Sequence, residues 1–341
     1  MLGSMPIVAR ECAVLVMRGV GASDIGRVRS HNEDVVLIRE DLQLFIVTDG
    51  AGGHDAGDVA AHLAARSIAN YIGATQVESA ELPEFDRFGL PSGARRLSRA
   101  VHKANADVWE IAQKYDQTRG MGTTVVAALL SPRSALLHVA HAGDSRCYRF
   151  RAGHLELLTL DHSLLTDVLE ARPDLEDEVL GRLPKHVVTR ALGMQATVRV
   201  SLHSHEVLPG DRYLLCSDGL SGYVPTDTIA GILGDPRPLG AVVQLLLNAA
   251  NDAGGRDNIA ALAVDAVPLD ETAPSVRSVA RLEAERQAAR ARADQGAEPE
   301  LLLLGIEEVN LRERFQAVPG SAVSEEQRRA IGELLANKRG P

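Results

Sequence analysis

The stretch from Leu42 to Asp58 limits what this chain can fold into more than any other part of it. It opens with a short apolar run, Leu42 to Val47, whose length and β-branched residues predict a buried strand. Asp49 follows at the edge of the expected core, and the glycines after it let the backbone turn sharply and approach a ligand. From Ala56 to Ile72 apolar residues recur at helical spacing. This order of elements is a common way to present one carboxylate to a metal or a phosphate.

The same combination of an acid and a neighbouring apolar strand recurs along the chain. The further acids are Asp144 after the run Leu136–Gly143, Asp218 after Tyr213–Cys216 and one serine, Asp257 before Ile259–Val264, and the pair Glu33 and Asp34 before Val35–Ile38. Positions of this kind can converge on one edge of a sheet. Because unpaired carboxylates held close together repel one another, such a cluster predicts bound hard cations.

The rest of the chain alternates short strands with a few longer helices. Val14–Met17 is expected to form a first strand, and Gly21–Asp34 to be polar and rich in turns. The other expected strands are Thr123–Leu130, Ala135–Ala140, Cys147–Phe150, Leu155–Leu158, Val198–Glu206 and Tyr213–Cys216, and the other expected helices are Ala94–Lys114, Thr226–Leu233 and Leu239–Ala253. Asp161–His186 is interpreted as a helical insertion.

Pro268 marks a change in composition. Beyond it, Ser275–Ala293 is rich in Ala, Arg and Glu and favours helix, and Leu301–Phe315 and Ser324–Asn337 are expected to be two further short helices. We therefore divide the chain into a folded unit over residues 1–267 and a helical, partly flexible tail over residues 268–341, which could dock a partner.

Composition argues against several classes of protein. No uninterrupted apolar stretch is long enough to span a membrane, and no clear cleavage site follows the N-terminus, so we expect neither a membrane span nor a signal peptide. The three cysteines are far apart and odd in number, which indicates a reducing compartment without disulfides. The net charge of −10 argues weakly against nucleic acid as a partner, and ordinary solubility explains it as well. Together these features favour a cytoplasmic protein.

Eight segments, in this order along the chain, match the motifs of one protein family. They are SDIGRVRSHNED (Ser23–Asp34), FIVTDGAGGHDAGDVAA (Phe45–Ala61), MGTTVVAALL (Met121–Leu130), HVAHAGDSRCY (His138–Tyr148), LTLDHSL (Leu158–Leu164), TRALG (Thr189–Gly193), LLCSDGL (Leu214–Leu220) and GGRDNIA (Gly254–Ala260). The chain thereby resembles the metal-dependent protein phosphatases, the type 2C serine/threonine phosphatases, and above all their bacterial branch. The resemblance covers nearly all of Val14–Val267.

The resemblance implies a fold, an activity and a cofactor. The fold would be α+β, a four-layer α-β-β-α sandwich of two antiparallel β-sheets flanked by helices. The activity would be hydrolysis of phosphoserine and phosphothreonine in the protein substrates of a serine/threonine kinase. The cofactor would be two Mn²⁺ or Mg²⁺ ions, with a third ion in some bacterial members. A hydroxide bridging the two ions would attack phosphorus in line, without a covalent enzyme intermediate.

The resemblance also implies a role for each matching residue. The residues at or near the ions would be Asp49 bridging both, the Gly50 carbonyl on the first, Asp218 and Asp257 on the second, Glu33 near the second through water, and Asp144 with Asp218 on a third. Arg29 would bind the substrate phosphate, and Asp34 would hold a metal-bound water. Oxygen ligands and a guanidinium suit divalent cations and a phosphoryl group.

Other readings of these residues remain open. Asp49 and Asp218 stand in Asp-Gly pairs and could be turn acids, Asp144 could merely fix a turn, and Arg29 could be a surface arginine. The whole unit could be a catalytically idle regulatory or binding module on the same fold. Ala51 departs from relatives that have a histidine or methionine after the Asp-Gly pair, which leaves the source of the leaving-group proton open.

Overall fold

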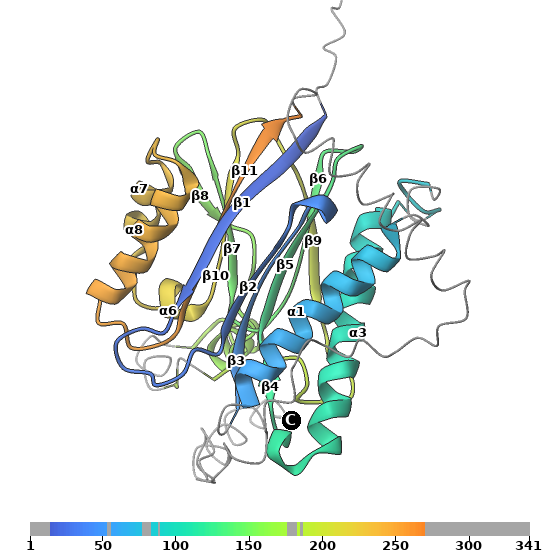
Figure 1. Ribbon diagram of the computed structural model, residues 1–341, viewed down its shortest axis with the longest axis vertical. Helices are drawn as coiled ribbons and strands as arrows, with labels where there is room; N and C mark the ends of the chain where they lie inside the picture. Colours follow the sequence, from blue (N-terminus) through green and yellow to red (C-terminus); the bar gives the residue numbers. More distant parts are fainter. Residues whose placement is uncertain are drawn as a thin grey trace, which may run out of the picture.

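Two antiparallel β-sheets pack face to face in the computed structural model, with helices on both outer faces (Figure 1). The structure describes residues 14–52, 56–76, 83–87, 89–175, 183–184 and 187–269. Its strands are β1 (Leu15–Asp24), β2 (Asp34–Arg39), β3 (Leu44–Ala51), β4 (Gly122–Thr123), β5 (Val125–Ser131), β6 (Leu136–Ala142), β7 (Arg146–Arg151), β8 (His154–Leu157), β9 (Ser201–Glu206), β10 (Arg212–Cys216) and β11 (Ile259–Pro268). One sheet has the order β1-β11-β10-β7-β8 and the other β2-β3-β5-β6-β9, with β4 paired to β3.

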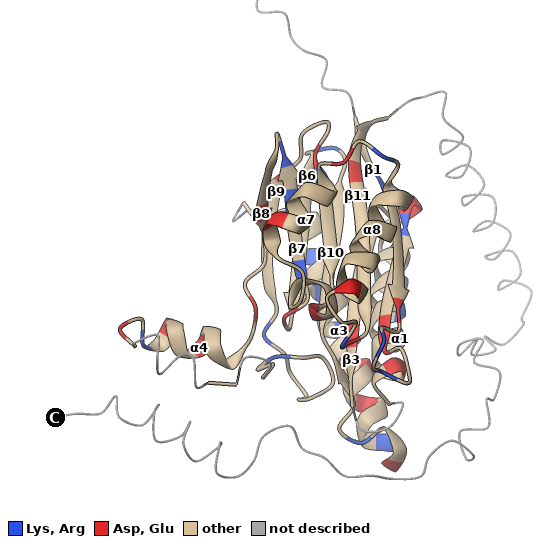
Figure 2. Cartoon of the chain, turned by 90° about the vertical axis from the view of Figure 1, so that its left-hand side faces the viewer, with Lys and Arg blue, Asp and Glu red and all other residues tan. Residues whose placement is uncertain are grey.

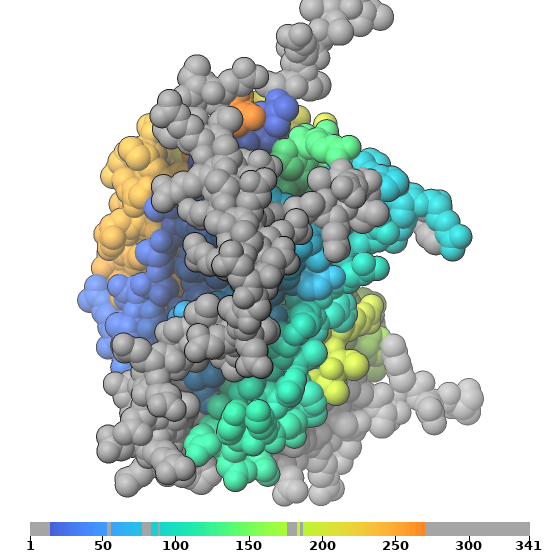
Figure 3. All heavy atoms as spheres, turned by 45° about the vertical axis from the view of Figure 1, so that its right-hand side comes forward, coloured from blue at the N-terminus to red at the C-terminus, as the bar shows by residue number. Residues whose placement is uncertain are grey.

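Two pairs of helices cover the sandwich. The helices are α1 (Ala56–Ala74), α3 (Ser92–Lys114), α4 (Leu164–Ala171), α6 (Asp218–Ser221), α7 (Thr226–Leu233) and α8 (Leu239–Asp252), with the 3-10 turns η1 (Glu40–Leu42) and η2 (Asp116–Thr118). α1 and α3 cover the sheet that contains β3, and α3 lies on the surface in Figure 3, whereas α7 and α8 cover the sheet that contains β11. α4 projects away from the sandwich (Figure 2).

The core explains why the strand sequences read as unbroken apolar runs. Phe45 of β3 points between the two sheets, while its neighbour Ile46 points outward under α1 and α3. On the other sheet Leu215 lies between the sheets and Leu214 lies under α7 and α8. A strand covered on both faces needs apolar side chains at every position, because successive residues point to opposite sides. The predicted four-layer α-β-β-α sandwich is therefore confirmed.

The prediction for the first strand was too short. β1 continues to Asp24 and pairs with β11 at all ten of its positions, so part of the stretch expected to be rich in turns is strand. Glycine makes this possible, because a Cβ at Gly19 would lie 2.7 Å from the Phe45 ring and one at Gly21 would lie 2.7 Å from Val36. β1 can thus pack closely on the opposite sheet. From sequence alone, a glycine needed for such close packing cannot be told from a glycine needed for a turn.

Several expectations fall wholly or partly outside the described residues. The tail from residue 270 onward, with its three expected helices, is among them, as are residues 1–13. Of the predicted insertion Asp161–His186, the structure describes α4 and the chain on either side of residues 176–182 and 185–186. In the part of the chain that is described, no helix combines the length and apolar character needed to cross a membrane.

Candidate metal centre

Asp34 and Asp49 stand directly opposite each other on the neighbouring strands β2 and β3. Asp34 is buried, and the Ser217 hydroxyl donates a hydrogen bond of 2.6 Å to its Oδ2 atom. Its Oδ1 atom is buried and has no hydrogen-bond partner among the described residues. Burial raises the pKa of Asp34, and the nearby Asp218 and Asp257 raise it further. A buried carboxylate with an unsatisfied oxygen suits a position beside a cation or an ordered water.

The backbone at Asp49 is fixed by two threonines. Its amide donates to the Thr124 hydroxyl at 3.2 Å, and its carbonyl accepts from the Thr124 amide at 2.8 Å and from the Thr123 hydroxyl at 2.9 Å. Burial raises the pKa of Asp49 well above its ordinary value, and the charges of Asp34, Asp218, Asp144 and Asp257 raise it further. The structure therefore brings five of the predicted acids into one electrostatic neighbourhood.

Glu33 and Gly50 meet the first turn of α1. The Gly50 amide donates to the Glu33 carbonyl at 3.1 Å. A Cβ at Gly50 would lie 2.2 Å from the Gly57 carbonyl oxygen, and a Cβ at Gly57 would lie 2.7 Å from the Glu33 carboxylate. Both glycines therefore allow the end of β3, the Glu33 side chain and α1 to approach more closely than side chains would permit.

Arg29 lies against Asp257 on the exposed rim of this cluster. Its guanidinium contacts the Asp257 carboxylate at 2.8 Å, with 51% of the arginine side chain and 26% of the aspartate side chain exposed. Burial alone would lower the pKa of Arg29, but Asp257, Glu33 and Asp49 together raise it. The guanidinium is thus held by the field of the acids and remains accessible from solvent.

Asn258 holds the loop that carries Arg29 beside the acids. Its side-chain carbonyl accepts from the Glu33 amide at 3.0 Å, and its side-chain amide donates to the carbonyls of Ile25 at 3.0 Å and His31 at 2.8 Å. Its own amide donates to Asp257 Oδ1 at 2.9 Å. One asparagine therefore joins the segment before β2 to the segment before β11.

Asp144 lies in the turn between β6 and β7. Burial raises the pKa of Asp144 to about 7, and the charge of Asp218 adds to the effect. Gly143 has a φ of +118°, and a Cβ there would lie 2.5 Å from Thr124, so the turn passes close to that residue. The hydroxyls of Thr124 and Ser145 are 2.7 Å apart. Thr124 therefore links the turn of Asp144 to the backbone of Asp49.

The donor set fits hard divalent cations. It consists of carboxylate oxygens and the Gly50 carbonyl, which are the ligands that Mn²⁺ and Mg²⁺ prefer, and neighbouring acids help to raise the pKa values of Asp34, Asp49 and Asp144. As they stand, no three acidic, histidine or cysteine side chains among the described residues meet the geometry of a metal site. The Asp257 carboxylate is instead drawn to Arg29 and the Asp34 carboxylate to Ser217. Binding through Asp257 would therefore require a small side-chain movement that exchanges its contact with Arg29 for a cation.

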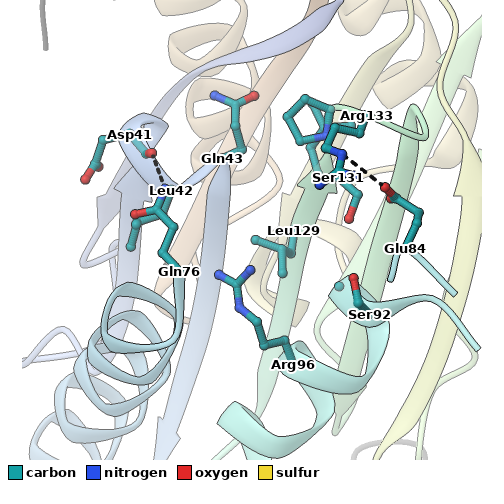
Figure 4. A pocket seen from close by; sticks show the side chains of 13 residues that line it. Asp41, Leu42, Gln43, Gln76, Glu84, Ser92, Arg96, Leu129, Ser131 and Arg133 are labelled. Atoms are coloured by element: carbon teal, nitrogen blue, oxygen red, sulfur yellow. Dashed lines mark hydrogen bonds and ion pairs between the residues drawn. The ribbon is translucent and has the colours of Figure 1, made fainter. Parts of the chain in front are cut away.

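A separate cavity of about 270 Å³ lies away from this cluster (Figure 4). It is lined by residues from η1, by Gln76 just after α1, and by residues from the start of α3, the end of β5 and the turn after it. Its two acids each contact an arginine, Asp41 with Arg39 at 2.7 Å and Glu84 with Arg133 at 3.7 Å. None of the predicted site residues lines it, so this cavity is not the catalytic centre.

The family is decided by a match to the model described as Protein phosphatase 2C, which covers residues 20–262. The chain belongs to the protein phosphatase 2C family. The serine/threonine phosphatase Stp of Listeria monocytogenes is 33% identical over 247 residues, or 71% of this chain and 93% of Stp. PstP of Mycobacterium tuberculosis is 32% identical over 256 residues, or 75% of this chain and 46% of PstP.

Solved structures of the family agree with the observed fold. The catalytic domain of PstP in complex with two manganese ions has 32% identity and a TM-score of 0.61, covering 74% of this chain and 99% of that domain. A phosphatase from Mycobacterium smegmatis in complex with cacodylate has 31% identity and a TM-score of 0.60, covering 73% of this chain and 98% of that one. This protein phosphatase 2C member is a serine/threonine protein phosphatase.

The sequence predicts the acids that lie together in this phosphatase but not the residues that hydrogen-bond to them. Ser217 binds Asp34 across 183 positions of sequence, and Asn258 spans 225 positions to reach the Glu33 amide. Both are short polar residues beside a predicted acid, and that adjacency is the one signal that could have identified them. The partners themselves follow from long-range strand pairing, which the residue pattern does not specify.

Proposed function

We propose that this phosphatase removes phosphate from phosphoserine and phosphothreonine in proteins with the help of two Mn²⁺ or Mg²⁺ ions. The observation that supports the proposal is the electrostatic interaction of Asp49 with Asp34, Asp144, Asp218 and Asp257. The accessible guanidinium of Arg29 lies at the rim of this cluster. Asp49, Asp218, Asp257 and the Gly50 carbonyl would hold the ions, with Glu33 beside them. When bound, the ions supply Lewis acidity and activate water as the nucleophile.

Arg29 binds and orients the substrate. Its present partner is Asp257, an exposed contact that is exchanged readily because both groups are partly solvated. If Asp257 were to hold a metal ion, the Arg29 guanidinium would be released to turn toward the substrate. Its fork of donors matches two phosphoryl oxygens, which both positions the phosphorus and neutralises charge that develops during transfer.

Asp34 orients water at the site and accepts its proton. Ser217 fixes Oδ2, which leaves the buried Oδ1 as a further hydrogen-bond acceptor. An acceptor held in one direction costs little reorganisation when the water attacks. Ala51 carries no proton donor, and its pairing with Gly122 places a bare methyl group where some relatives have histidine. The leaving oxygen must therefore be protonated by another group or by water.

Asp144 would hold a third ion together with Asp218, whose charge acts on it. The substrates would be the targets of a serine/threonine kinase in the cytoplasm, and the unit over residues 1–267 would carry the activity. The tail over residues 268–341, with its amphipathic runs, would dock a partner. A catalytically idle module is disfavoured, because an idle site gains nothing from keeping the carboxylates crowded against their mutual repulsion.

The test is phosphate release from a phosphothreonine peptide by the full chain, with and without added Mn²⁺, alongside calorimetric titration of Mn²⁺. We expect release only with the metal, and loss of release on adding a chelator. Full activity in excess chelator would refute the metal mechanism. Metal binding with no release from any phosphopeptide would instead favour the idle module.

A further inference from the structure

Two buried histidines stack beneath the turn that carries Asp144. The rings of His141 and His162 are 4.5 Å apart between centroids and 7° from parallel. His141 lies in β6, three residues before Asp144, and His162 lies in the segment between β8 and α4. Neither ring is among the predicted metal ligands, so their burial and pairing call for another explanation.

His162 makes a reciprocal pair of hydrogen bonds with Gly143. The His162 amide donates to the Gly143 carbonyl at 2.9 Å, and the Gly143 amide donates to His162 Nδ1 at 3.2 Å. Because Nδ1 accepts, the proton of the neutral ring is on Nε2, which donates to the Ser201 hydroxyl at 2.9 Å. The ring is therefore fixed at both nitrogens, and the glycine before Asp144 is fixed at both its amide and its carbonyl.

His141 completes the arrangement from the opposite side. Its Nε2 atom lies 2.8 Å from the carbonyl of Leu160, two residues before His162. His162 thus binds the backbone two residues after His141, and His141 binds the backbone two residues before His162. Further contacts extend this join, since Arg146 pairs with Asp161 at 2.7 Å and the Cys147 amide donates to the Thr159 hydroxyl at 3.1 Å.

We propose that His162 is a positioning residue, whose Nδ1 atom holds the Gly143 amide and thereby sets the direction of the Asp144 carboxylate. Gly143 has a φ of +118°. Because glycine can adopt many backbone conformations, this one needs hydrogen bonds to hold it. Thr124 and Ser145 fix the far side of the turn, and His162 fixes the near side. Asp144 is therefore held between two anchors.

The same residue joins the base of the α4 excursion to this turn. The His162 carbonyl accepts from the Thr189 amide at 2.9 Å, and the Leu164 amide donates to the Val187 carbonyl at 2.9 Å. The chain thus leaves toward α4 and returns beside His162. The base of this excursion is therefore joined to the turn of Asp144, while α4 itself projects from the sandwich in Figure 2.

This inference rests on the proposed role of Asp144, so its test includes a readout that needs no activity. In the metal-free full chain, His162→Ala is expected to speed amide hydrogen exchange at Gly143 roughly five- to tenfold. His162→Asn retains an acceptor near the Nδ1 position and is expected to exchange as the parent does. Ser201→Ala removes only the hydrogen bond to His162 Nε2 and is expected to speed exchange at Gly143 less than His162→Ala does. His154→Asn changes an exposed histidine of β8 and serves as the matched control.

The second readout is Mn²⁺ affinity by calorimetry. His162→Ala is expected to lower the Mn²⁺ affinity by roughly ten- to a hundredfold, at the same site whose affinity Asp144→Asn lowers. The double variant is expected to bind Mn²⁺ no more weakly than Asp144→Asn alone. Unchanged exchange at Gly143, or effects on affinity that multiply in the double variant, would overturn the positioning role. A parent that binds no Mn²⁺ and releases no phosphate would overturn the proposed function, while exchange at Gly143 would still decide the role of His162.

Discussion

Replacing Gly57 by alanine tests whether the Glu33 carboxylate works where the structure places it. Gly57 is the second residue of α1, and its missing side chain leaves the space that the Glu33 carboxylate occupies. A Cβ built there would lie 2.7 Å from that carboxylate, whereas an ordinary contact needs roughly 3.5 Å. Gly57→Ala therefore pushes the end of the Glu33 side chain away by roughly 0.8 Å. The Glu33 side chain is flexible, so the backbone need not move.

The expected result separates activity from stability. Alanine favours helix over glycine by roughly 0.5–1 kcal/mol, which offsets part of the cost of displacing Glu33, so the free energy of unfolding should change by less than about 1 kcal/mol. A misplacement on the order of 1 Å at a reacting centre can reduce kcat by roughly a hundredfold. We expect kcat on a phosphothreonine peptide to fall by roughly 10- to 100-fold, together with weaker Mn²⁺ binding.

Gly73→Ala in the same helix is the matched control. A Cβ at Gly73 meets only Leu42, at 3.7 Å, so this variant changes helix propensity without touching the site. Urea unfolding and steady-state kinetics should be measured for both variants at saturating Mn²⁺. Equal kcat values for Gly57→Ala and Gly73→Ala, with unchanged metal affinity, would show that the position of Glu33 does not matter to the reaction.

Three further predictions follow from the site and the core. Asp49→Asn and Asp218→Asn should each abolish turnover while far-ultraviolet circular dichroism shows an intact fold; parent rates in both would mean that the site is elsewhere. Arg29→Ala should raise KM and lower kcat/KM for a phosphopeptide, since it removes the phosphate contact; unchanged kinetics would leave Arg29 as a surface partner of Asp257. Burial, aided by Arg96, lowers the pKa of His138 from 6.5 to about 4, so only the unfolded chain is protonated between these values. His138 should therefore contribute a loss of about 3 kcal/mol from the free energy of unfolding as the pH drops from 6.5 to 4, seen in urea unfolding in chelator as the difference between the parent and His138→Gln, and equal slopes in the two would contradict this.

The acids could be predicted from sequence because each adjoins its strand along the chain. Asp49 comes within the last residues of β3, where a buried apolar run reaches the edge of the core, and local patterning suffices to see this. Its place opposite Asp34 could not be predicted in the same way. β3 is apolar on both faces, so hydrophobic patterning alone does not specify the register in which β2 pairs with it.

The supporting residues were missed for a related reason. His141 lies in an apolar run and His162 at the start of the segment interpreted as a helical insertion, and only the tertiary fold stacks their rings. Likewise, Gly21 opens the stretch expected to be rich in turns, although its missing side chain lets β1 approach Val36. Each of these functions is a contact between distant segments. Residue type and spacing do not reveal such a contact, because they do not show which distant segments pair.

The position of β11 has a consequence for how the enzyme is made. β11 lies between β1 and β10, pairs with β1 at ten positions, and is the last strand of the described chain to leave the ribosome. The Ala260 amide that holds Ser217, and the Asp257 that faces Arg29, belong to this strand or directly precede it. A nascent chain that stops short of β11 lacks an inner strand of one sheet and part of the acid cluster. Activity is therefore expected only after synthesis has passed β11, because neither the sheet nor the cluster is complete before then.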